Sequence, residues 1–139
     1  MDTDFKLERF VEAQAPVYQV VVAELKAGRK TGHWMWFIFP QIAGLGRSAT
    51  AQKFAISSAD EAAAYLAHPL LGPRLRECCA LVAANDDREV DEIFGAPDNL
   101  KFHSAMTLFA EIAPDEAVFQ DCINKFFDGL PDQATIDRL

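Results

Sequence analysis

The chain has 139 residues, of which half are hydrophobic and about a quarter are charged, with a formal net charge of −8 at pH 7. This length suits one domain with one buried core over residues 1–139, and the apolar content excludes a disordered or solvating segment. The negative charge repels phosphate groups and anionic lipid headgroups, so we expect neither duplex nucleic acid nor a membrane surface as a partner.

The first predicted elements are helical. Apolar residues recur at helical spacing from Phe5 to Leu25, with Pro16 between two groups of them and Gly28 as a C-terminal cap. This pattern predicts two helices, or one helix with a kink at Pro16. A short apolar run follows at residues 33–39. A lone short strand would leave its backbone groups without partners, so we expect a buried helical turn there.

The middle of the chain predicts a loop and then two helices. The loop is marked by Gly44 and Gly46. Ser58, with Glu61 three residues later, is the capping-box pattern and predicts the start of a helix. That helix should end before Pro69, because the residue preceding a proline avoids α geometry. The proline itself can open the next helix.

The C-terminal half predicts three more helices and a short last turn. Asp86 and Glu89 precede an apolar group that Gly95 ends, which is typical of a short capped helix. Helical stripes follow between residues 97 and 114 and from residue 114 to Gly129, and residues 132–139 can add one turn. We therefore predict a mainly α fold, a compact single-domain bundle of about six to eight helices with a short sheet or none.

Standard catalytic and metal-binding motifs are missing from the sequence. It contains no G-x-S-x-G elbow, no P-loop, no G-x-G-x-x-G after a strand, no H-E-x-x-H pair and no EF-hand loop. His33, His68 and His103 lie far apart, and none has a carboxylate or thiol at helical spacing. We expect no metal site, and the sequence implies no cofactor.

Cysteine usage and the lack of long apolar segments bear on location. Cys78, Cys79 and Cys122 fit neither a disulfide framework nor a C-x-x-C motif, so we expect reduced core residues. The apolar stretches are shorter than the roughly 20 residues that span a bilayer, and the first residues lack the pattern of a signal peptide. We therefore expect a cytoplasmic location.

The most unusual segment, residues 30–53, combines two tryptophans, a histidine, an amide, nearby glycines and cationic side chains. Indoles offer apolar area and one N–H donor, glycines let a ligand approach the backbone, and the polar side chains can bind anionic groups. The segment predicts a pocket for a small anionic or nucleotide-like ligand. The alternative is that the aromatic residues form the core and the glycines serve a turn. The candidate ligand-binding residues are His33, Trp34, Trp36, Gln41, Arg47, Ser48 and Lys53.

A second polar group lies on a predicted helix in the C-terminal half. Lys101, Ser104 and Thr107 are spaced by three residues and share one face, which adds them to the candidate ligand-binding residues. The alternative is structural: Asp98 complements the helix N-terminus and pairs with Lys101, and the hydroxyls bond to the preceding turn. Glu61 or Asp98 is the candidate general acid or base, provided that burial shifts its pKa.

Several strings of the sequence resemble one known family. The most specific are H-W-M-W-F-I-F-P-Q at residues 33–41 and M-T-L-F at residues 106–109. Shorter strings of the same kind are Gly44-Leu45-Gly46-Arg47-Ser48, His68-Pro69, Ile93-Phe94-Gly95 and Pro97-Asp98. From about residue 5 to residue 139 the chain is similar to the bacterial domain-of-unknown-function family 1810, whose members are sometimes mislabelled calpastatin. The resemblance implies a mainly α-helical fold and no established activity.

Two functional hypotheses follow. The first is that the protein binds a small anionic ligand in a pocket. In its enzymatic form, this hypothesis predicts an enzyme that acts on a nucleotide-derived or ADP-ribose-like metabolite. The order of an aromatic segment, a glycine turn, Gln52-Lys53-Phe54 and then Lys101-Phe102 is also similar to families that process ADP-ribose or NAD-derived metabolites. The alternative is a non-enzymatic protein-interaction domain with an unknown protein partner. A concave site lined by the polar candidates favours the first hypothesis, and their dispersal over a convex surface favours the second.

Overall fold

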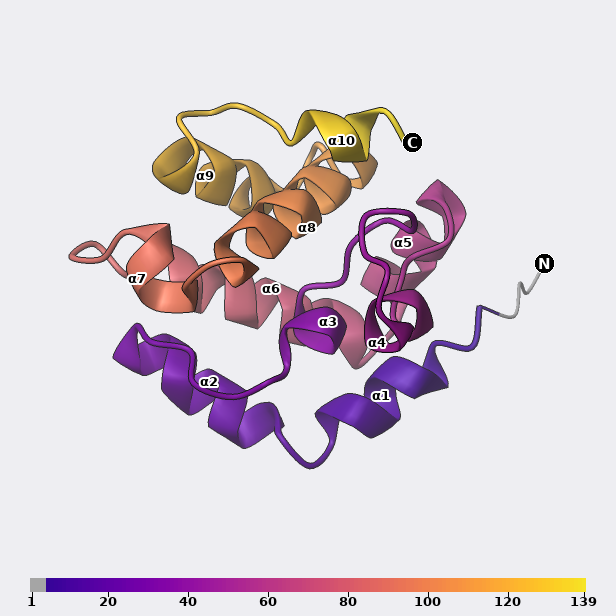
Figure 1. Cartoon of the computed structure of the whole chain (residues 1–139), viewed down its shortest axis with the longest axis horizontal. Coiled ribbons are helices and arrows are strands. Elements are labelled where there is room, and N and C mark those ends of the chain that lie inside the picture. Colours follow the sequence, from indigo (N-terminus) through magenta and orange to yellow (C-terminus); the bar gives the residue numbers. More distant parts are fainter. Residues whose placement is uncertain (1–4) are drawn as a thin grey trace.

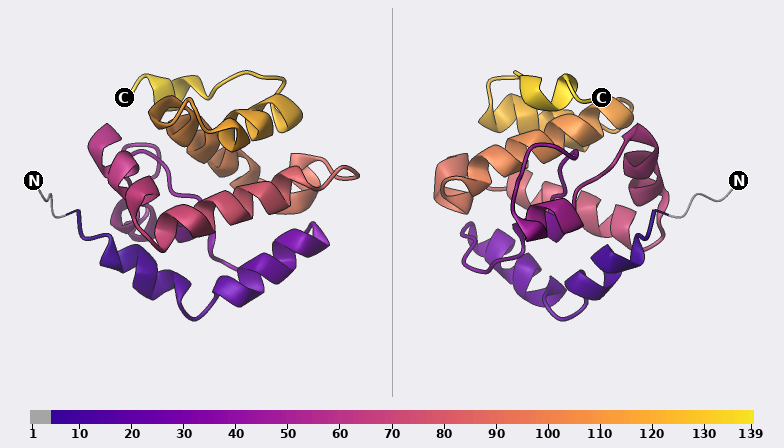
Figure 2. Two further views of the ribbon diagram at one scale, coloured as in Figure 1. Left: turned by 180° about the vertical axis from the view of Figure 1, so that it is seen from behind. Right: turned by 45° about the vertical axis from the view of Figure 1, so that its right-hand side comes forward.

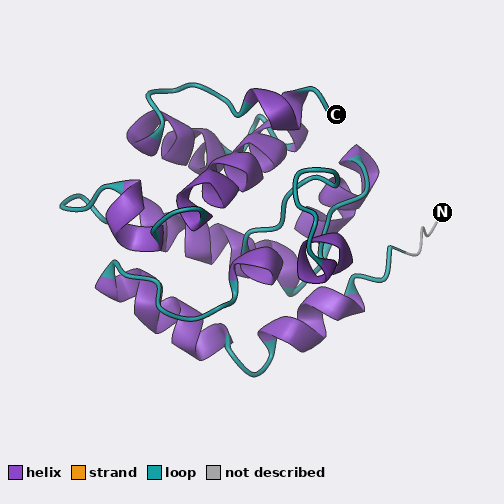
Figure 3. Cartoon of the chain, viewed as in Figure 1, coloured by secondary structure: helices purple, strands orange, loops and turns teal. Residues whose placement is uncertain are grey.

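Ten helices form the computed structural model over residues 5–139, the part of the chain that the structure describes (Figures 1 and 3). No strand occurs over this range, and one parallel β-bridge joins Ile42 and Ile56. The predicted mainly α fold is confirmed. Of the four helices with only four or five residues, α3, α7 and α10 lie where a short helix or turn was predicted, and α4 was not predicted. The helices are α1 (Glu8–Gln14), α2 (Tyr18–Ala27), α3 (Met35–Ile38), α4 (Ala49–Lys53), α5 (Ala59–Ala67), α6 (Leu71–Ala83), α7 (Val90–Phe94), α8 (Asp98–Ile112), α9 (Ala117–Phe126) and α10 (Gln133–Ile136).

Helix α8 is the central element of the fold. It packs against α5, α7, α9 and α10, while α6 packs against α2, α5 and α9. Figure 1 shows α9 and α10 on one side of the molecule and an open V of α1 and α2 on the other. The rear view in Figure 2 shows α6 running between these two groups. The short helix α3 packs against α1 and lies between the same two groups. No helix over residues 5–139 combines the length and the apolar character needed to cross a membrane.

A connected series of aromatic rings links the two sides of the core. The ring of Tyr65 meets that of Phe10 edge-on at 5.1 Å between centroids and contacts the ring of Phe109 at 5.6 Å. Phe109 in turn lies 5.7 Å from Phe119. These buried residues come from α1, α5, α8 and α9. Because each such ring removes roughly 150–250 Å² from water, the series holds the N-terminal and C-terminal helices in one hydrophobic core.

Local capping explains several helix ends. Gly28 ends α2 with a φ of 74°, in the left-handed region that glycine adopts without strain. Ser58 accepts a hydrogen bond from the Glu61 N–H at the start of α5, as its pattern predicts. His68 Nδ1 accepts from the backbone N–H groups of Leu70 and Leu71 and thereby caps α6. Each of these signals lies within three residues of the group that it satisfies.

Three expected helix starts differ in the structure. Helix α6 begins at Leu71 and not at Pro69, which lies in the preceding turn. Glu89 alone caps α7, in a reciprocal box with Glu92, whereas Asp86 binds the Lys125 ammonium at 2.6 Å. Helix α9 begins at Ala117 and not at residue 114, because a turn precedes it. Pro16 lies in the turn between two separate helices, so the version with one kinked helix is wrong.

The three thiols are free and buried. Burial raises the pKa of the Cys78 and Cys122 thiols to about 12 and that of Cys79 well above its ordinary value. All three side chains are therefore protonated at neutral pH and behave as small apolar core residues. This confirms the expectation of reduced core cysteines.

Candidate functional site

Trp36 lies where three hollows meet. Its neighbours in α3, Met35 and Ile38, are 2% exposed and point into the core, while Trp36 itself is half-buried. An inner recess of about 140 Å³ is bounded by Trp36, Gln41, Ile42, Gly46, Ala51 and Phe54. An outer groove of about 250 Å³ is bounded by Trp36, Gln41, Gly46, Leu100, Lys101, Ser104 and Asp132. A lysine hollow of about 90 Å³ is bounded by Lys30, His33, Trp36, Asp98 and Lys101.

Two ion pairs connect Lys30, Asp98 and Lys101, and the Lys101 ammonium lies beside the Trp36 ring. The Lys101 ammonium lies 4.0 Å from the centroid of the ring and 3.0 Å from Asp98 Oδ1. The other oxygen of this carboxylate, Oδ2, lies 2.7 Å from the Lys30 ammonium, whose side chain is 7% exposed. Lys30 also donates to the Gly32 carbonyl at 2.5 Å. Two cations thus share one carboxylate, and the cluster keeps a net positive charge beside the indole.

The environment of Asp98 fixes its ionisation. Burial on its own would raise the pKa of this carboxyl group, but the hydrogen bonds from Lys30 and Lys101 outweigh burial and lower the pKa below its ordinary 3.8. Asp98 is therefore a carboxylate at neutral pH. It can accept a proton or hold a cation, but it has no proton to donate as a general acid.

Gln41 carries a buried donor that the protein does not use. Its side chain is 8% exposed, and among residues 5–139 its Nε2 group has no hydrogen-bond partner. The backbone is fixed by the β-bridge, in which the Ile56 N–H donates to the Gln41 carbonyl at 2.8 Å. Gln41 borders both the inner recess and the outer groove. A buried donor without an acceptor costs roughly 1–3 kcal/mol, so this amide is a candidate for ligand recognition.

Ser104 and Thr107 attach the C-terminal segment to α8. Ser104 donates to Asp132 Oδ2 at 2.7 Å, and Thr107 Oγ1 accepts from the Asp132 N–H at 2.9 Å. Thr135 donates to the same carboxylate oxygen at 2.7 Å. These bonds position Asp132 and α10 as one wall of the outer groove. The two hydroxyl groups therefore shape the groove by holding its wall.

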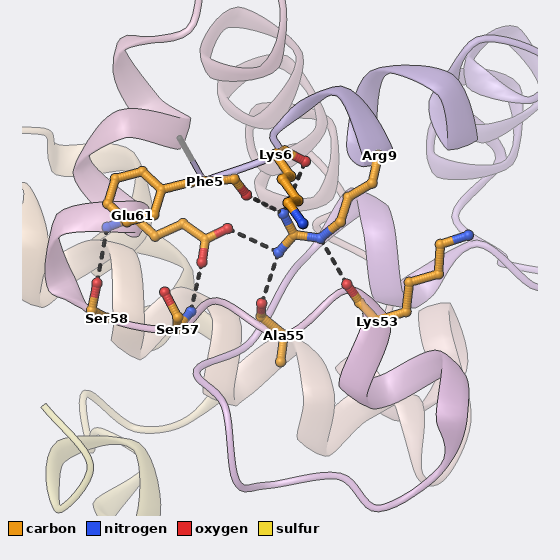
Figure 4. A network of polar contacts seen from close by, with 8 residues as sticks. All are labelled: Phe5, Lys6, Arg9, Lys53, Ala55, Ser57, Ser58 and Glu61. Carbon is orange, nitrogen blue, oxygen red and sulfur yellow. Dashed lines mark hydrogen bonds and ion pairs between the residues drawn. The ribbon is translucent and has the colours of Figure 1, made fainter. Parts of the chain in front are cut away.

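A separate polar network surrounds Arg9 (Figure 4). The guanidinium donates to Glu61 Oε2 at 2.8 Å and to the Lys53 and Ala55 carbonyls at 2.7 and 2.9 Å. Glu61 Oε1 accepts from the Ser57 N–H at 2.7 Å. In Figure 4 the Lys53 ammonium points away from the guanidinium. Both carboxylate oxygens of Glu61 are thus engaged in joining α1 to the segment before α5, which is a structural arrangement.

The chain is similar to a protein family and to a solved structure. The model of the family DUF1810, described as a protein of unknown function, matches residues 4–139. The chain belongs to this family. A similar solved structure is that of the conserved hypothetical protein Rv1873 from Mycobacterium tuberculosis, which is 53% identical in sequence. The match covers 99% of this chain and 98% of that chain, with a TM-score of 0.97. No curated protein matches the chain.

The structure of this DUF1810 chain brings together half of the predicted site residues. His33, Trp36, Gln41, Asp98, Lys101 and Ser104 border the three hollows around Trp36. Trp34 is 2% exposed in the core, where its indole N–H donates to Glu24. Thr107 is buried beneath the groove wall.

The remaining predicted residues of this DUF1810 chain lie elsewhere. Arg47 and Ser48 are exposed, and the Ser48 hydroxyl caps α4 by accepting from the Ala51 N–H. Lys53 and Glu61 border a fourth hollow, which Arg9 also lines and Trp36 does not. Lys30 and Asp132 belong to the site but were not among the candidates. Both meet α8 from distant parts of the sequence, so no local spacing signals their role.

Proposed function

We propose that this DUF1810 protein binds a small anionic, nucleotide-like ligand at Trp36, in the outer groove and the inner recess. The observation that carries the proposal is the Lys101 ammonium 4.0 Å from the centroid of a half-buried indole that borders three hollows. An aromatic face contributes roughly 1–3 kcal/mol per stacked base, and a cation beside it can bind a phosphate. A cytoplasmic location belongs to the same proposal.

Lys101 has binding capacity left for a ligand. An ammonium group has three N–H donors, and the described contacts of Lys101 use one of them, on Asp98. Its flexible stem lets the ammonium move from the ring toward a phosphate oxygen. Lys30 cannot share this task, because it is buried between Asp98 and the Gly32 carbonyl. Lys101 is therefore the phosphate-binding residue of the proposal.

The proposal extends to turnover of a nucleotide-derived or ADP-ribose-like metabolite, with Asp98 as a general base. Its lowered pKa keeps Asp98 ionised, which speaks against a general acid, but it also makes the carboxylate a weak base. A general-base role therefore requires a ligand that draws the two lysines away from Asp98. Glu61, the other acid–base candidate, borders a different hollow from the one at Trp36. If Asp98 is the general base, the wild type should consume the substrate and Asp98→Asn should not.

The test is a thermal-shift screen against nucleotides, NAD, ADP-ribose and phosphorylated metabolites. A ligand at a hundred times its dissociation constant stabilises a protein by about 2.7 kcal/mol. We expect a shift for the wild type and for Lys125→Ala, a control whose ammonium also lies beside a carboxylate and a ring. Trp36→Ala and Lys101→Ala should lose the shift while remaining folded. If no ligand class shifts the wild type, the proposal is wrong.

A second candidate function, a protein-interaction domain, is favoured by two exposed leucines. Leu100 and Leu130 are 62% and 66% exposed. His103, three residues after Leu100 in α8, lies with its Nε2 2.7 Å from the Leu130 carbonyl, and its ring stacks on Phe127 at 3.9 Å. If the ligand screen gives no shift, this surface is the next site to test. A protein partner should bind Leu100→Asp and Leu130→Asp more weakly than the wild type.

A further inference from the structure

We infer that the inner recess recognises one six-membered ring with a hydrogen-bond acceptor, and that Gln41 is the residue that selects it. The inference rests on the proposed function, and it names the ligand class: monocyclic bases such as pyrimidines, in preference to purines. It follows from the size of the recess, from its unpaired donor and from its connection to Lys101.

The size of the recess limits its occupant. Its volume is about 140 Å³. A cavity of about 150 Å³ holds one benzene molecule, so a single ring fills the recess and a fused purine would extend out of it into the outer groove. The walls formed by Trp36, Ile42 and Phe54 are apolar, which suits the faces of a planar ring.

The polarity of the recess limits the chemistry of that ring. Of the two amides that border it, Gln52 already donates to the Arg47 carbonyl at 3.0 Å. Gln41 Nε2 is buried and has no acceptor among residues 5–139. A carbonyl oxygen or an unprotonated ring nitrogen would supply the acceptor, whereas a hydrocarbon ring would leave the donor unpaired. The amide therefore selects for a heterocycle with an acceptor.

The recess communicates with the groove that carries Lys101. Trp36, Gln41 and Gly46 border both hollows. A Cβ atom at Gly46 would lie 2.5 Å from the Ala51 Cβ and 3.3 Å from the Trp36 Cη2, so Gly46 packs closely against both residues and a larger side chain there would displace the shared wall. A ring in the recess can therefore continue into a sugar and a phosphate in the outer groove, where Lys101 meets the anionic end.

The experiment follows the indole N–H signals by NMR during titration with uridine 5′-monophosphate and adenosine 5′-monophosphate. The chain has only two tryptophans, so buried Trp34 serves as the internal reference and Trp36 as the reporter. We expect the uridine nucleotide to shift the Trp36 signal and to bind about tenfold or more tightly than the adenosine nucleotide. Gln41→Met should weaken the uridine nucleotide roughly three- to tenfold, the loss of one hydrogen bond, and leave the adenosine nucleotide unchanged.

A second pair of variants tests the recess without touching the amide. Ala51→Leu adds carbon atoms to a wall of the recess and should abolish the preference for the uridine nucleotide. Ala49→Leu, on the exposed side of the same helix, should keep it. Chemical shifts of the Trp34 indole report whether each variant keeps the native core.

The outcomes separate the inference from the proposed function. If both nucleotides bind equally, and Gln41→Met and Ala51→Leu change neither, the inference is overturned. The proposed function still stands in that case, provided that Lys101→Ala abolishes binding. If neither nucleotide nor any ligand of the screen binds the wild type, the proposed function fails, and the inference fails with it.

Discussion

Lys101 in α8 lies beside Trp36 in α3, a helix distant in sequence, and its ammonium is 4.0 Å from the centroid of the ring. Asp98, one turn earlier in α8, holds that ammonium at 3.0 Å and so aims it at α3. The indole is half-buried, so one part of it packs against the core and another part borders the hollows. This pairing gives the site both a stacking surface and a cation.

The first prediction concerns Lys101→Met, which keeps most of the apolar stem and removes the charge. Stability should fall by at most about 1 kcal/mol, because both members of the ion pair are partly exposed. Affinity for a phosphate ligand should fall roughly tenfold or more, the loss of a charge-assisted bond. Urea unfolding and the Trp36 indole titration measure the two effects. Equal losses in Lys101→Met and in the control Lys125→Met would contradict the role of Lys101.

Two buried glutamines supply the second prediction. Gln14 is satisfied, because its Nε2 donates to the Phe37 carbonyl at 2.7 Å and to the Tyr65 hydroxyl at 3.1 Å, whereas Gln41 Nε2 has no partner among the described residues. Gln14→Met should therefore cost about 2–3 kcal/mol, since it leaves buried groups unpaired. Gln41→Met should be neutral or stabilising by up to about 1 kcal/mol.

Urea unfolding of the two glutamine variants at neutral pH tests this difference. Both substitutions place a thioether of similar length at a buried position, so differences in packing are small and the hydrogen bonds decide the result. A loss of stability in Gln41→Met as large as that in Gln14→Met would mean that the Gln41 amide stabilises the fold. Ligand recognition would then no longer explain why a polar side chain is buried there.

Much of the fold was predictable because its signals are local. The ends of α2 and α5 depend on Gly28 and Ser58, which satisfy groups within a turn of their own position. The same reasoning predicted Asp86 at the start of α7, but the N-cap of this helix is Glu89. By residue type Asp86 is the better N-cap, but its carboxylate binds Lys125, on a helix that folds back from far along the chain, and Glu89 is the cap instead.

The site was predictable only in part, for a related reason. Trp34 and Trp36 are two residues apart in a run too short to show a period, yet one is enclosed by the core and the other borders the hollows. Composition marked both as candidates and could not separate them. Lys30 and Asp132 reach α8 through the tertiary fold alone. Gln41 was predicted as a polar contact, but only the structure reveals that its amide is buried without a partner.

The third prediction compares two aspartates that each bind a lysine. Asp98→Asn leaves the buried Lys30 ammonium without its carboxylate and should cost about 1–3 kcal/mol at neutral pH. Asp86→Asn, at an exposed pair with Lys125, should change stability little. Urea unfolding of both variants beside the wild type measures the difference. Similar small effects in both variants would contradict the buried character of the Lys30 contact.

Asp98 also predicts a pH dependence with a defined sign. Its pKa in the folded protein is lower than its ordinary 3.8, so its contribution to stability is complete above that value and is lost as the pH falls through the folded pKa. The stability difference between the wild type and Asp98→Asn should therefore be larger at about pH 7 than at about pH 3. A difference that stays constant, or grows with acidity, would show that the carboxylate is not stabilised by its lysines.

The last prediction concerns Arg9 and Glu61, an ion pair that joins α1 to α5. Arg9→Met removes one partner of an ion pair whose carboxylate side chain is 3% exposed, and it also leaves the Lys53 and Ala55 carbonyls without their donor. The expected cost is about 3 kcal/mol, because an unpaired buried carboxylate is strongly unfavourable. Glu61→Gln should cost less, since the amide oxygen can still accept from the guanidinium or from the Ser57 N–H.

The double variant distinguishes a structural pair from a catalytic carboxylate. If Glu61 serves only to neutralise and hold Arg9, the two losses in urea unfolding should be less than additive, with a coupling of about 1–3 kcal/mol. Binding and turnover of any ligand identified at Trp36 should be the same in Glu61→Gln as in the wild type, because Glu61 borders a different hollow. Additive losses, or a loss of turnover in Glu61→Gln without a loss of stability, would instead place Glu61 in the chemistry of the protein.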